Sequence, residues 1–504
     1  MSRRDMVHCP VNVREPEGLT TAEGPNRKLR KEPSIVRVTH TADDPAQQGA
    51  VTEGAGRIPA GAVDSVRGSP WTETSSDPQA QRLLERVVES GNMKRAWKQV
   101  KRNKGAPGVD GRTIADTETF LKAAWPDIRQ ALLDGTFQPR PVRRVEIPKP
   151  GGGTRKLGVP TVVDRLIQQA ICQVLTPLFD PTFSEYSYGF RLTRSAHDAV
   201  RQARAYQQVG KQWVVDMDLK QFFDEVNHDI LMARVGRKVK DKRLKRLINA
   251  YLKSGVLLGA AGHEPTAKGT PQGGPLSPLL SNILLDDLDK ELERRGLSFC
   301  RYADDCNIYV ASRRAAERVM RSITGFLEGV LKLKVNREKS AVARPWKRKF
   351  LGFSTQKVFG RIRTSVPDVT LARFRARLKE LFHEGRGRNP ARFITERVNP
   401  VLRGWLQYFS LGTSRSQLTT LDFWIRRRLR CIIWRQWKRP ATRLKKLRDL
   451  GIRDDRAYIA ASRKGPWHCA GTPAVIQALT PEFFDSLGLY GLTEQYEVLR
   501  TTST

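Results

Sequence analysis

Two adjacent carboxylates lie between two short apolar stretches at residues 299–310, and this pattern limits how the segment can fold. The flanking stretches, 299–302 and 306–310, are rich in aromatic, β-branched and other apolar side chains, which favour strands. A tight turn between them would place Asp304 and Asp305 at an exposed tip. Like charges repel there unless a cation such as a divalent metal with oxygen ligands neutralises them. An ordinary Asp-Asp turn is the alternative.

A second acidic segment lies upstream, where Asp216, Asp218 and Asp224 accompany the apolar stretch that begins at Trp213. Strand alternation directs Asp216 and Asp218 to the same face, so spacing alone leaves these acids in competition for one role. Carboxylates from neighbouring strands can hold two divalent ions that act on the attacking and leaving oxygens of phosphoryl transfer. Together the two acidic segments predict such a metal site.

The excess of positive charge indicates a nucleic-acid partner. The 504 residues include 89 Lys and Arg against 52 Asp and Glu, a formal net charge of +37, and this excess is typical of proteins that cover many phosphates. The six cysteines form no Cys-x-x-Cys pair, which argues against a zinc ribbon or a disulfide framework. No apolar run is long enough for a membrane span or a signal peptide, so we expect no membrane association.

Three motifs occur in the order in which one family carries them. They are Tyr302-Ala-Asp-Asp305, an aromatic residue five positions after Asp218 at Phe223, and a Gln-Gly-Gly-Pro segment that begins at Gln272. With these motifs the chain resembles the reverse transcriptases encoded within group II introns, over about residues 80 to 480. The resemblance implies that Asp218, Asp304 and Asp305 are the catalytic residues and metal ligands. It also implies two Mg²⁺ ions, for which Mn²⁺ can substitute.

The resemblance implies an α+β fold in the form of a right-hand polymerase. Fingers at residues 79–210 and a palm at 211–360, with antiparallel sheet, would precede an α-helical thumb and maturase domain (domain X) at 361–480 and a tail at 481–504. Residues 1–78 lack apolar periodicity and are rich in Pro and Gly, which predicts a disordered leader. Many members also carry a Cys/His endonuclease, which we do not expect here because neither the length nor the cysteine pattern accommodates one.

The resemblance also implies contacts to the nucleotide and the nascent base pair. Two basic strand-like stretches joined by glycines resemble a fingertip hairpin that holds the incoming triphosphate, although binding of template phosphates is the alternative. The aromatic residue after Asp218 would stack beneath the deoxyribose, unless it belongs to the core. A lysine downstream of the palm would act as a general acid for the pyrophosphate. The candidates for nucleotide binding are Lys149, Arg155, Phe223, Gln272, Gly273 and Lys339.

The region from residue 371 to 450 is helical in pattern and strongly basic, with 21 Lys or Arg against 5 acids. Its apolar residues at helical spacing, such as Trp424 and Leu429, are expected in the core. Its arginines occur all around the helix and cannot all be buried, so a surface for folded RNA or for a primer duplex accounts for them. The candidates for RNA binding are Arg426, Arg427, Arg428, Arg430 and Arg435.

These observations predict an RNA-directed DNA polymerase encoded by a group II intron. It would extend a DNA primer on an RNA template with deoxynucleoside triphosphates, primed at the target or at a replication fork. It would also bind intron RNA to assist splicing and mobility, in the bacterial cytoplasm as a nucleoid-associated ribonucleoprotein. The alternatives are an RNA-binding maturase without polymerase activity and a domesticated or defence-associated reverse transcriptase.

Overall fold

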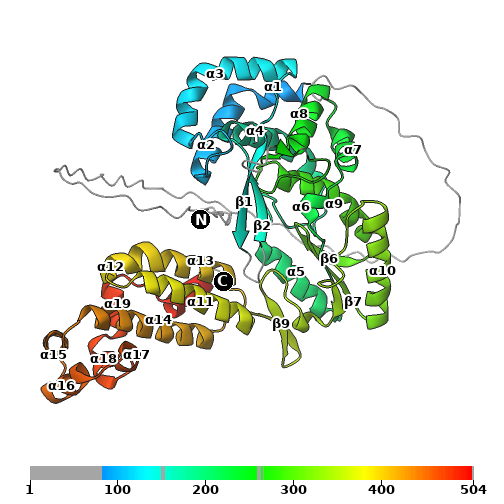
Figure 1. The fold of residues 1–504 in the computed structure, drawn as a ribbon. Helices are drawn as coiled ribbons and strands as arrows, with labels where there is room; N and C mark the ends of the chain where they lie inside the picture. Colours follow the sequence, from blue (N-terminus) through cyan, green and yellow to red (C-terminus); the bar gives the residue numbers. More distant parts are fainter. Residues whose placement is uncertain (1–81, 149–153, 258–262, 265, 502–504) are drawn as a thin grey trace, which may run out of the picture. The chain divides into compact units, whose positions relative to one another are not determined.

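The computed structural model of the chain describes residues 82–148, 154–257, 263–264 and 266–501 (Figure 1). The expected leader at 1–78 and the candidate Lys149 lie outside these described residues. The described part is an α+β structure, as the sequence predicts, with strands confined to its first two thirds and helices alone after β10. None of the described helices is both long enough and apolar enough to cross a membrane.

The expected fingers begin with helices that surround the buried helix α4. Apolar side chains on most sides of α4, among them Leu166, Ile167 and Ile171, account for its burial. The elements of this region are α1 (Leu83–Val87), α2 (Ser90–Asn103), α3 (Ile114–Asp134), β1 (Val142–Pro148), β2 (Thr154–Val159), α4 (Val162–Phe179) and α5 (Ala196–Gln208). Strands β1 and β2 form an antiparallel hairpin, and β1 also pairs with β4 in a sheet of order β2-β1-β4-β5.

The expected palm holds a second sheet, of order β6-β7-β3-β8, in which all neighbours are antiparallel. Successive side chains of β3 point to opposite faces of the sheet. Val215 and Met217 therefore belong to the large hydrophobic core, whereas Val214 belongs to a smaller cluster. The elements are β3 (Trp213–Met217), α6 (Phe222–Glu225), α7 (His228–Lys238), α8 (Lys242–Lys253), β4 (Val256–Leu257), β5 (His263–Glu264), α9 (Ser277–Arg294), β6 (Ser298–Tyr302), β7 (Asp305–Val310), α10 (Arg313–Gly329) and β8 (Ala341–Ala343).

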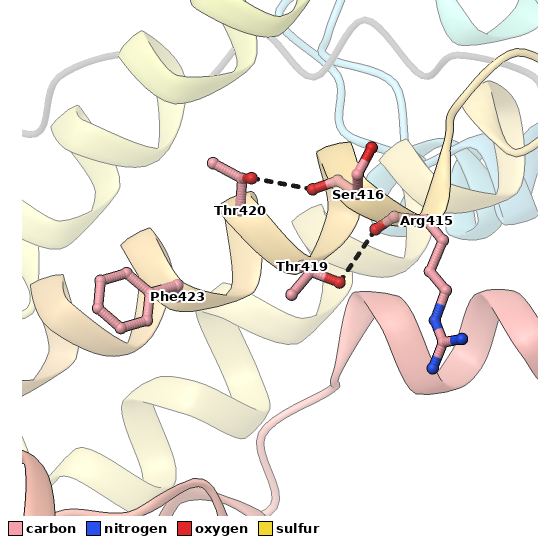
Figure 2. A pocket seen from close by; sticks show the side chains of 5 residues that line it. All are labelled: Arg415, Ser416, Thr419, Thr420 and Phe423. Atoms are coloured by element: carbon pink, nitrogen blue, oxygen red, sulfur yellow. Dashed lines mark hydrogen bonds between the residues drawn. The ribbon is translucent and has the colours of Figure 1, made fainter.

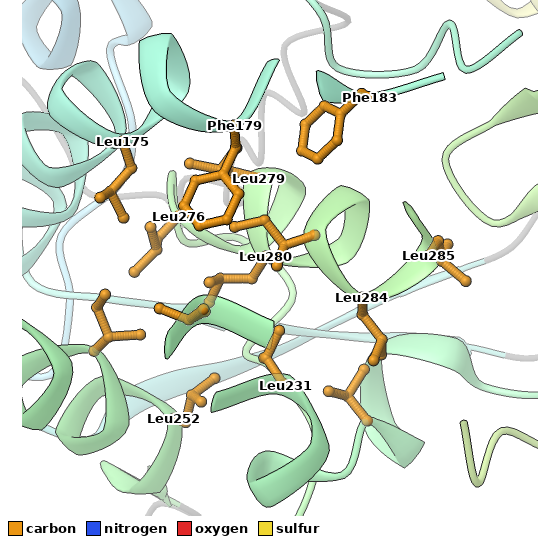
Figure 3. Packing of buried hydrophobic residues seen from close by; sticks show 14 of the residues in the cluster. Leu175, Phe179, Phe183, Leu231, Leu252, Leu276, Leu279, Leu280, Leu284 and Leu285 are labelled. Carbon is orange, nitrogen blue, oxygen red and sulfur yellow. The ribbon is translucent and has the colours of Figure 1, made fainter. Parts of the chain in front are cut away.

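One hydrophobic core unites the expected fingers and palm. Phe179 from α4 packs in the same cluster as Leu231 from α7 and Leu280 from α9 (Figure 3). Because these side chains exclude water together, we expect α4, α7 and α9 to act as one rigid support for the sheet beside them.

The last part of the chain is helical and has its own core around α14. Trp434 of α14 is fully buried, and Leu402 and Phe484 belong to the same cluster. The elements are β9 (Ser354–Val358), β10 (Arg361–Ser365), α11 (Asp368–Glu384), α12 (Pro390–Phe393), α13 (Asn399–Phe409), α14 (Arg415–Gln436), α15 (Pro440–Asp449), α16 (Asp454–Ser462), α17 (Pro466–Cys469), α18 (Pro473–Ala478), α19 (Pro481–Ser486) and α20 (Leu492–Thr501).

Residues 481–501 differ from the separate tail that the sequence predicts. The Asp422 carboxylate accepts hydrogen bonds from the backbone N–H groups of Leu492 and Thr493, at 3.0 and 2.9 Å. This carboxylate therefore caps α20, a stabilising arrangement at a helix N-terminus. Phe484 and Leu492 are fully buried in the helical core, so α19 and α20 belong to the helical domain.

Candidate active site and nucleic-acid interface

The turn between β6 and β7 places the acidic pair at the tip of a hairpin, as the sequence predicts. Tyr302 pairs with Asp305 across the hairpin, which leaves Ala303 and Asp304 at the turn. Ala303 has a φ of 57°, in the left-handed region that a tight turn requires here. Asp304 is half-buried and Asp305 is exposed, so both carboxylates are available at the end of the sheet.

A buried ion pair supports this turn from inside. Arg301 and Asp289 have no exposed side-chain surface and lie 2.6 Å apart. The Arg301 guanidinium also donates to the backbone oxygen of Ala303 at 2.9 Å, so the pair is bonded directly to the turn. Sequence reasoning missed this arginine, because only the fold brings α9 beneath β6.

Gly189 allows its own segment of the chain to pack closely against the β6–β7 turn. A Cβ at this position would lie 2.3 Å from the backbone nitrogen of Ala303, far closer than two such atoms approach. The segment is held there because the backbone N–H of Tyr188 donates to the oxygen of Arg301 at 2.8 Å. The segment 187–190, Ser-Tyr-Gly-Phe, therefore shapes the acidic turn, although the sequence alone does not reveal this contact.

Asp218 follows the last residue of β3 and has partners of its own. Asn336 donates to its Oδ2 at 2.9 Å, and the Asp218 backbone N–H donates to the Ser340 hydroxyl at 3.0 Å. The Lys339 ammonium lies 4.0 Å from the same Oδ2 and is largely exposed. The segment 336–340 thus orients Asp218, and Lys339 lies beside the site as the resemblance implies.

Asp216 is paired with an arginine, whereas Asp218 has, among the described residues, no cation closer than the Lys339 ammonium at 4.0 Å. Arg348 reaches the Asp216 Oδ2 with its Nη2 at 2.6 Å and its Nε at 2.7 Å. A carboxylate that already makes this two-pronged contact is a poor ligand for a metal ion. The geometry therefore favours Asp218 over Asp216, which spacing along the strand left open.

The acids of the two segments act on one another electrostatically. Although Asp305 is exposed at the turn, the surrounding chain removes part of the hydration of its carboxylate and raises its pKa to about 7, and the charges of Asp304, Asp216 and Asp218 add to this shift. Burial likewise raises the pKa of Asp304, with a contribution from Asp218. Met217 pairs with Cys306 across β3 and β7, so Asp218 and Asp305, which adjoin these residues, are neighbours at the end of the sheet.

The donor chemistry of Asp218, Asp304 and Asp305 fits a hard divalent cation, since all three offer carboxylate oxygens. Within the described residues, however, no three Asp, Glu, His or Cys side chains are gathered closely enough to enclose a metal ion. The three carboxylates therefore suit a cation in chemistry and charge, without forming a preformed cage.

Strand β2 of the β1–β2 hairpin is linked to both the acidic turn and the Gln-Gly-Gly loop. The charge of Arg155 lowers the pKa of Asp304, opposing the effect of burial, so this predicted triphosphate contact acts on the acidic turn. The backbone N–H of Gly158 donates to the oxygen of Gln272 at 2.8 Å. Gly273 has a φ of 134°, and a Cβ there would lie 2.6 Å from the oxygen of Gly158. Gln272 and Gly273 are thus docked against β2.

Phe223 lies in the short helix α6 and is half-buried. Its ring contacts that of Phe222 edge to face, with centroids 5.2 Å apart. Its backbone oxygen accepts from the N–H of Thr270 at 2.6 Å, next to the segment that carries Gln272. One side of the ring packs on the core and the rest is accessible, so packing and contact with a sugar are compatible.

The five candidate arginines of α14 divide into three groups by exposure. Arg426, Arg427 and Arg428 are half-buried, Arg435 is exposed, and Arg430 is only 2% exposed. The Arg430 Nε donates to the backbone oxygen of Leu479 at 2.9 Å. The prediction that Arg430 belongs to the RNA-facing surface is therefore wrong, because the packing of α14 against the segment after α18 covers it.

The half-buried arginines of α14 are poorly satisfied within the described chain. The Nε atoms of Arg426, Arg427 and Arg428 and the Nη1 of Arg430 are buried without a hydrogen-bond partner there. Burial, with repulsion from Arg426 and Arg427, lowers the pKa of Arg430 to about 10. The guanidiniums of Arg427 and Arg428 instead lie over the Trp467 ring, at 4.1 and 4.5 Å from its centroid. This cluster of cations suits a polyanion.

A hollow on the first half of α14 is formed by its own side chains (Figure 2). The Thr419 and Thr420 hydroxyls donate to the backbone oxygens of Arg415 and Ser416, at 3.0 and 2.9 Å. Phe423 lies at one end and is 55% exposed. The hollow contains no carboxylate, so it does not offer a second metal site.

Two family models match the chain in the regions just described. The model for reverse transcriptase (RNA-dependent DNA polymerase) matches residues 147–355, which include both acidic segments. The model for the group II intron maturase-specific domain matches residues 371–451, which include α14. The matched regions therefore correspond to the β6-β7-β3-β8 sheet with its surroundings and to the basic helical domain.

The chain is similar to several curated proteins. It is 33% identical to protein YkfC of Escherichia coli (strain K12) over 54% of this chain and 82% of YkfC. It is 39% identical to the group II intron-encoded protein LtrA of Lactococcus lactis subsp. cremoris over 41% of this chain. It is 32% identical to a putative COX1/OXI3 intron 2 protein of Saccharomyces cerevisiae over 42% of this chain. The matches span 34% of LtrA and 25% of the yeast protein.

The fold, the paired acidic segments and these similarities agree with one another. The chain belongs to the reverse transcriptases, RNA-directed DNA polymerases, that carry a group II intron maturase-specific domain.

Proposed function

We propose that Asp218, Asp304 and Asp305 are the catalytic carboxylates of this polymerase and hold two Mg²⁺ ions, for which Mn²⁺ can substitute. When bound, such ions activate the primer 3′-hydroxyl and stabilise the charge that develops on the leaving pyrophosphate. The observation that carries the proposal is the convergence of the β3 end and the β6–β7 turn, where burial, with added repulsion from the neighbouring acids, raises the pKa of Asp305 to about 7.

The surrounding residues bind and orient the substrates. Arg155 neutralises the triphosphate of the incoming deoxynucleotide, and its influence on Asp304 supports this place. Gln272 and Gly273 contact the nascent base pair from a loop docked on β2. Phe223 contacts the sugar from the accessible side of its ring.

Lys339 offers a proton beside the site. Its ammonium lies 4.0 Å from Asp218 and remains largely exposed, so it can reach a leaving pyrophosphate without first breaking a tight ion pair. Asn336 orients the Asp218 carboxylate through its 2.9 Å hydrogen bond, and a positioning role follows from this contact.

The helical domain binds intron RNA through the accessible arginines of α14. Arg426, Arg427, Arg428 and Arg435 form this surface, and Arg430 stays inside the domain. The guanidiniums of Arg427 and Arg428 lie over the Trp467 ring in a cluster of like charges, which supports contact with phosphates, because these are strong acceptors. This surface serves splicing assistance and also holds the RNA during cDNA synthesis.

The experiment is extension of a DNA primer on an RNA template with Mg²⁺ and deoxynucleoside triphosphates, comparing the wild type with Asp304→Asn. We expect extension by the wild type and a loss of about 10³-fold in the variant, because a metal ligand contributes several kcal/mol to the transition state. Binding of intron RNA by both proteins is measured in parallel. Equal extension by both proteins would refute the assignment of Asp304.

A maturase that assists splicing without polymerising DNA is the second candidate, and the arginines of α14 favour an RNA-binding role of this kind. If neither protein extends the primer while both bind intron RNA tightly, this candidate is correct. The two functions are compatible in one chain, since the acidic turn and α14 lie in different hydrophobic cores.

A further inference from the structure

The hairpin of β9 and β10 ends in an aromatic residue that is almost fully exposed. Val358 pairs with Arg361, so Phe359 and Gly360 form a two-residue loop. Both residues have positive φ, 48° and 76°, as in a type I′ turn, which favours Asn-Gly. A phenylalanine is strained in this conformation because its Cβ approaches the following carbonyl oxygen. Phe359 is nevertheless 98% exposed, so burial does not offset that strain.

A second turn in the same segment provides an internal comparison. Leu351 and Gly352 also have positive φ, 53° and 83°, between the bridged residues Phe350 and Phe353. Leu351, however, packs against the helical core, and its backbone oxygen accepts from the Tyr408 hydroxyl at 2.9 Å. Packing therefore offsets the strain at Leu351, and among the described residues no packing does so at Phe359.

The base of the β9–β10 hairpin is fixed to α5. The Thr355 hydroxyl donates to the Gln207 side-chain oxygen at 2.7 Å, and the Ile362 backbone N–H donates to that of Gln208 at 2.9 Å. Ile362 is also buried. The tip is therefore presented on a rigid base, which lowers the entropic cost of binding through Phe359.

The hairpin is basic around its tip. Lys357, Arg361 and Arg363 are exposed, and residues 354–365 contain no Asp or Glu. Arg361 and Arg363 share one face of the hairpin because side chains alternate along a strand, and the buried Ile362 points to the other face. An exposed aromatic ring at the tip of a hairpin that carries two cations on one face suits a partner that offers both flat rings and negative charge.

We propose that Phe359 stacks on an unpaired base of RNA bound by this protein, while Arg361 and Arg363 contact the adjacent phosphates. Unpaired RNA bases stack on aromatic side chains, and arginines beside them bind the backbone. A protein partner is less well matched, because it would have to supply both an apolar pocket and acidic residues. The proposal rests on the proposed function only in requiring that the protein binds RNA.

The test is the variant Phe359→Asn, which removes the ring and supplies the residue that a type I′ turn prefers. We expect a higher thermal midpoint than in the wild type, because the strain is relieved. Binding to a fluorescein-labelled, single-stranded RNA of mixed sequence should weaken about tenfold, the loss expected for one base stack. Binding to the same backbone with abasic sites should be alike in the two proteins.

The control is Val209→Asn, which changes an apolar residue that is 73% exposed at the end of α5. We expect this variant to bind both RNAs as the wild type does. Equal binding of the mixed-sequence RNA by Phe359→Asn and the wild type would overturn the proposal. So would an equal loss on the abasic RNA, or a loss of self-association with unchanged RNA binding. These binding assays need no polymerisation, so their outcome is independent of the proposed catalytic role of Asp304. A failure of the Phe359 proposal can therefore be distinguished from a failure of that role.

Discussion

The acidic turn between β6 and β7 and the arginine run of α14 both concentrate charges of one sign, and the signs are opposite. At the turn, burial raises the pKa values of Asp304 and Asp305, and repulsion among these acids and Asp218 adds to the shifts. On α14, burial lowers the pKa of Arg430, and repulsion from Arg426 and Arg427 adds to that shift. Each region would gain stability from a ligand of the opposite charge, a metal ion in the first and a phosphate in the second.

The buried pair beneath the acidic turn shows a different arrangement. Arg301 and Asp289 are fully buried, lie 2.6 Å apart and are matched in charge. Charges that hold this fold together are thus paired inside it, whereas charges proposed to meet a ligand are left in excess. A cluster of like charges without enough opposite charge therefore indicates a functional site here better than the presence of charged residues alone.

The largest effect is expected at Asp305. Asp305→Asn should lower the rate of primer extension about 10³-fold, because a metal ligand is lost. The same change should raise the thermal midpoint at pH 8 in EDTA. The reason is that the pKa of Asp305 in the folded protein, about 7, lies above its ordinary value, so its ionised form destabilises the fold.

The stability difference between Asp305→Asn and the wild type should depend on pH. The stability gained by Asp305→Asn should shrink as the pH falls from 7 towards 4, because the wild-type carboxylate then becomes protonated in the folded protein. Asp134→Asn, at an exposed position of α3, is the control and should change neither rate nor pH profile. An Asp305 variant that is less stable than the wild type at pH 8 would contradict the idea of excess charge at the turn.

Removing one charge of the buried Arg301–Asp289 pair should lower the stability of the protein, in contrast to the change at Asp305. Asp289→Leu leaves the Arg301 guanidinium buried without its carboxylate, so we expect a loss of about 3 kcal/mol in the free energy of unfolding. Urea denaturation measures this loss. The double variant Asp289→Leu with Arg301→Met should recover most of it, because neither charge is then buried alone. A double variant as unstable as the single one would show that the pair does more than neutralise itself.

A smaller effect is expected from neutralising Arg426 and Arg427. The double change to Gln should weaken binding of intron RNA about tenfold and lower the slope of log affinity against log salt by about 1.4, the value for two single-strand phosphate contacts. The loss of repulsion and the loss of the Arg427 contact with Trp467 act in opposite directions, so we expect little change in the stability of the protein. Fluorescence anisotropy across a salt series measures the affinities.

The matched control for that double variant uses arginines of the same domain that have acidic partners. Arg392 and Arg397 lie 2.9 and 2.6 Å from Glu396 and Glu384. Changing both to Gln removes the same formal charge, and we expect at most half the change in salt slope. Equal slopes for the two double variants would mean that net charge, not the α14 cluster, determines RNA binding.

Short residue patterns along the chain were sufficient to predict the strands of the candidate active site. The sequence predicted strands at 299–302 and 306–310, and the structure has β6 at Ser298–Tyr302 and β7 at Asp305–Val310. The α+β class and the helical, basic character of the later region were predicted in the same way. These features depend on neighbouring residues, because strand preference and helical spacing act over a few positions.

By itself, then, the sequence determined the acidic hairpin, the apolar strand before Asp218 and the excess of positive charge. Only the tertiary structure decided that Arg348 neutralises Asp216, that Gly189 lies against the acidic turn and that Arg430 is buried. Each of these outcomes depends on residues distant in the chain. Burial and charge pairing depend on which elements pack together, and that packing cannot be predicted from local residue patterns.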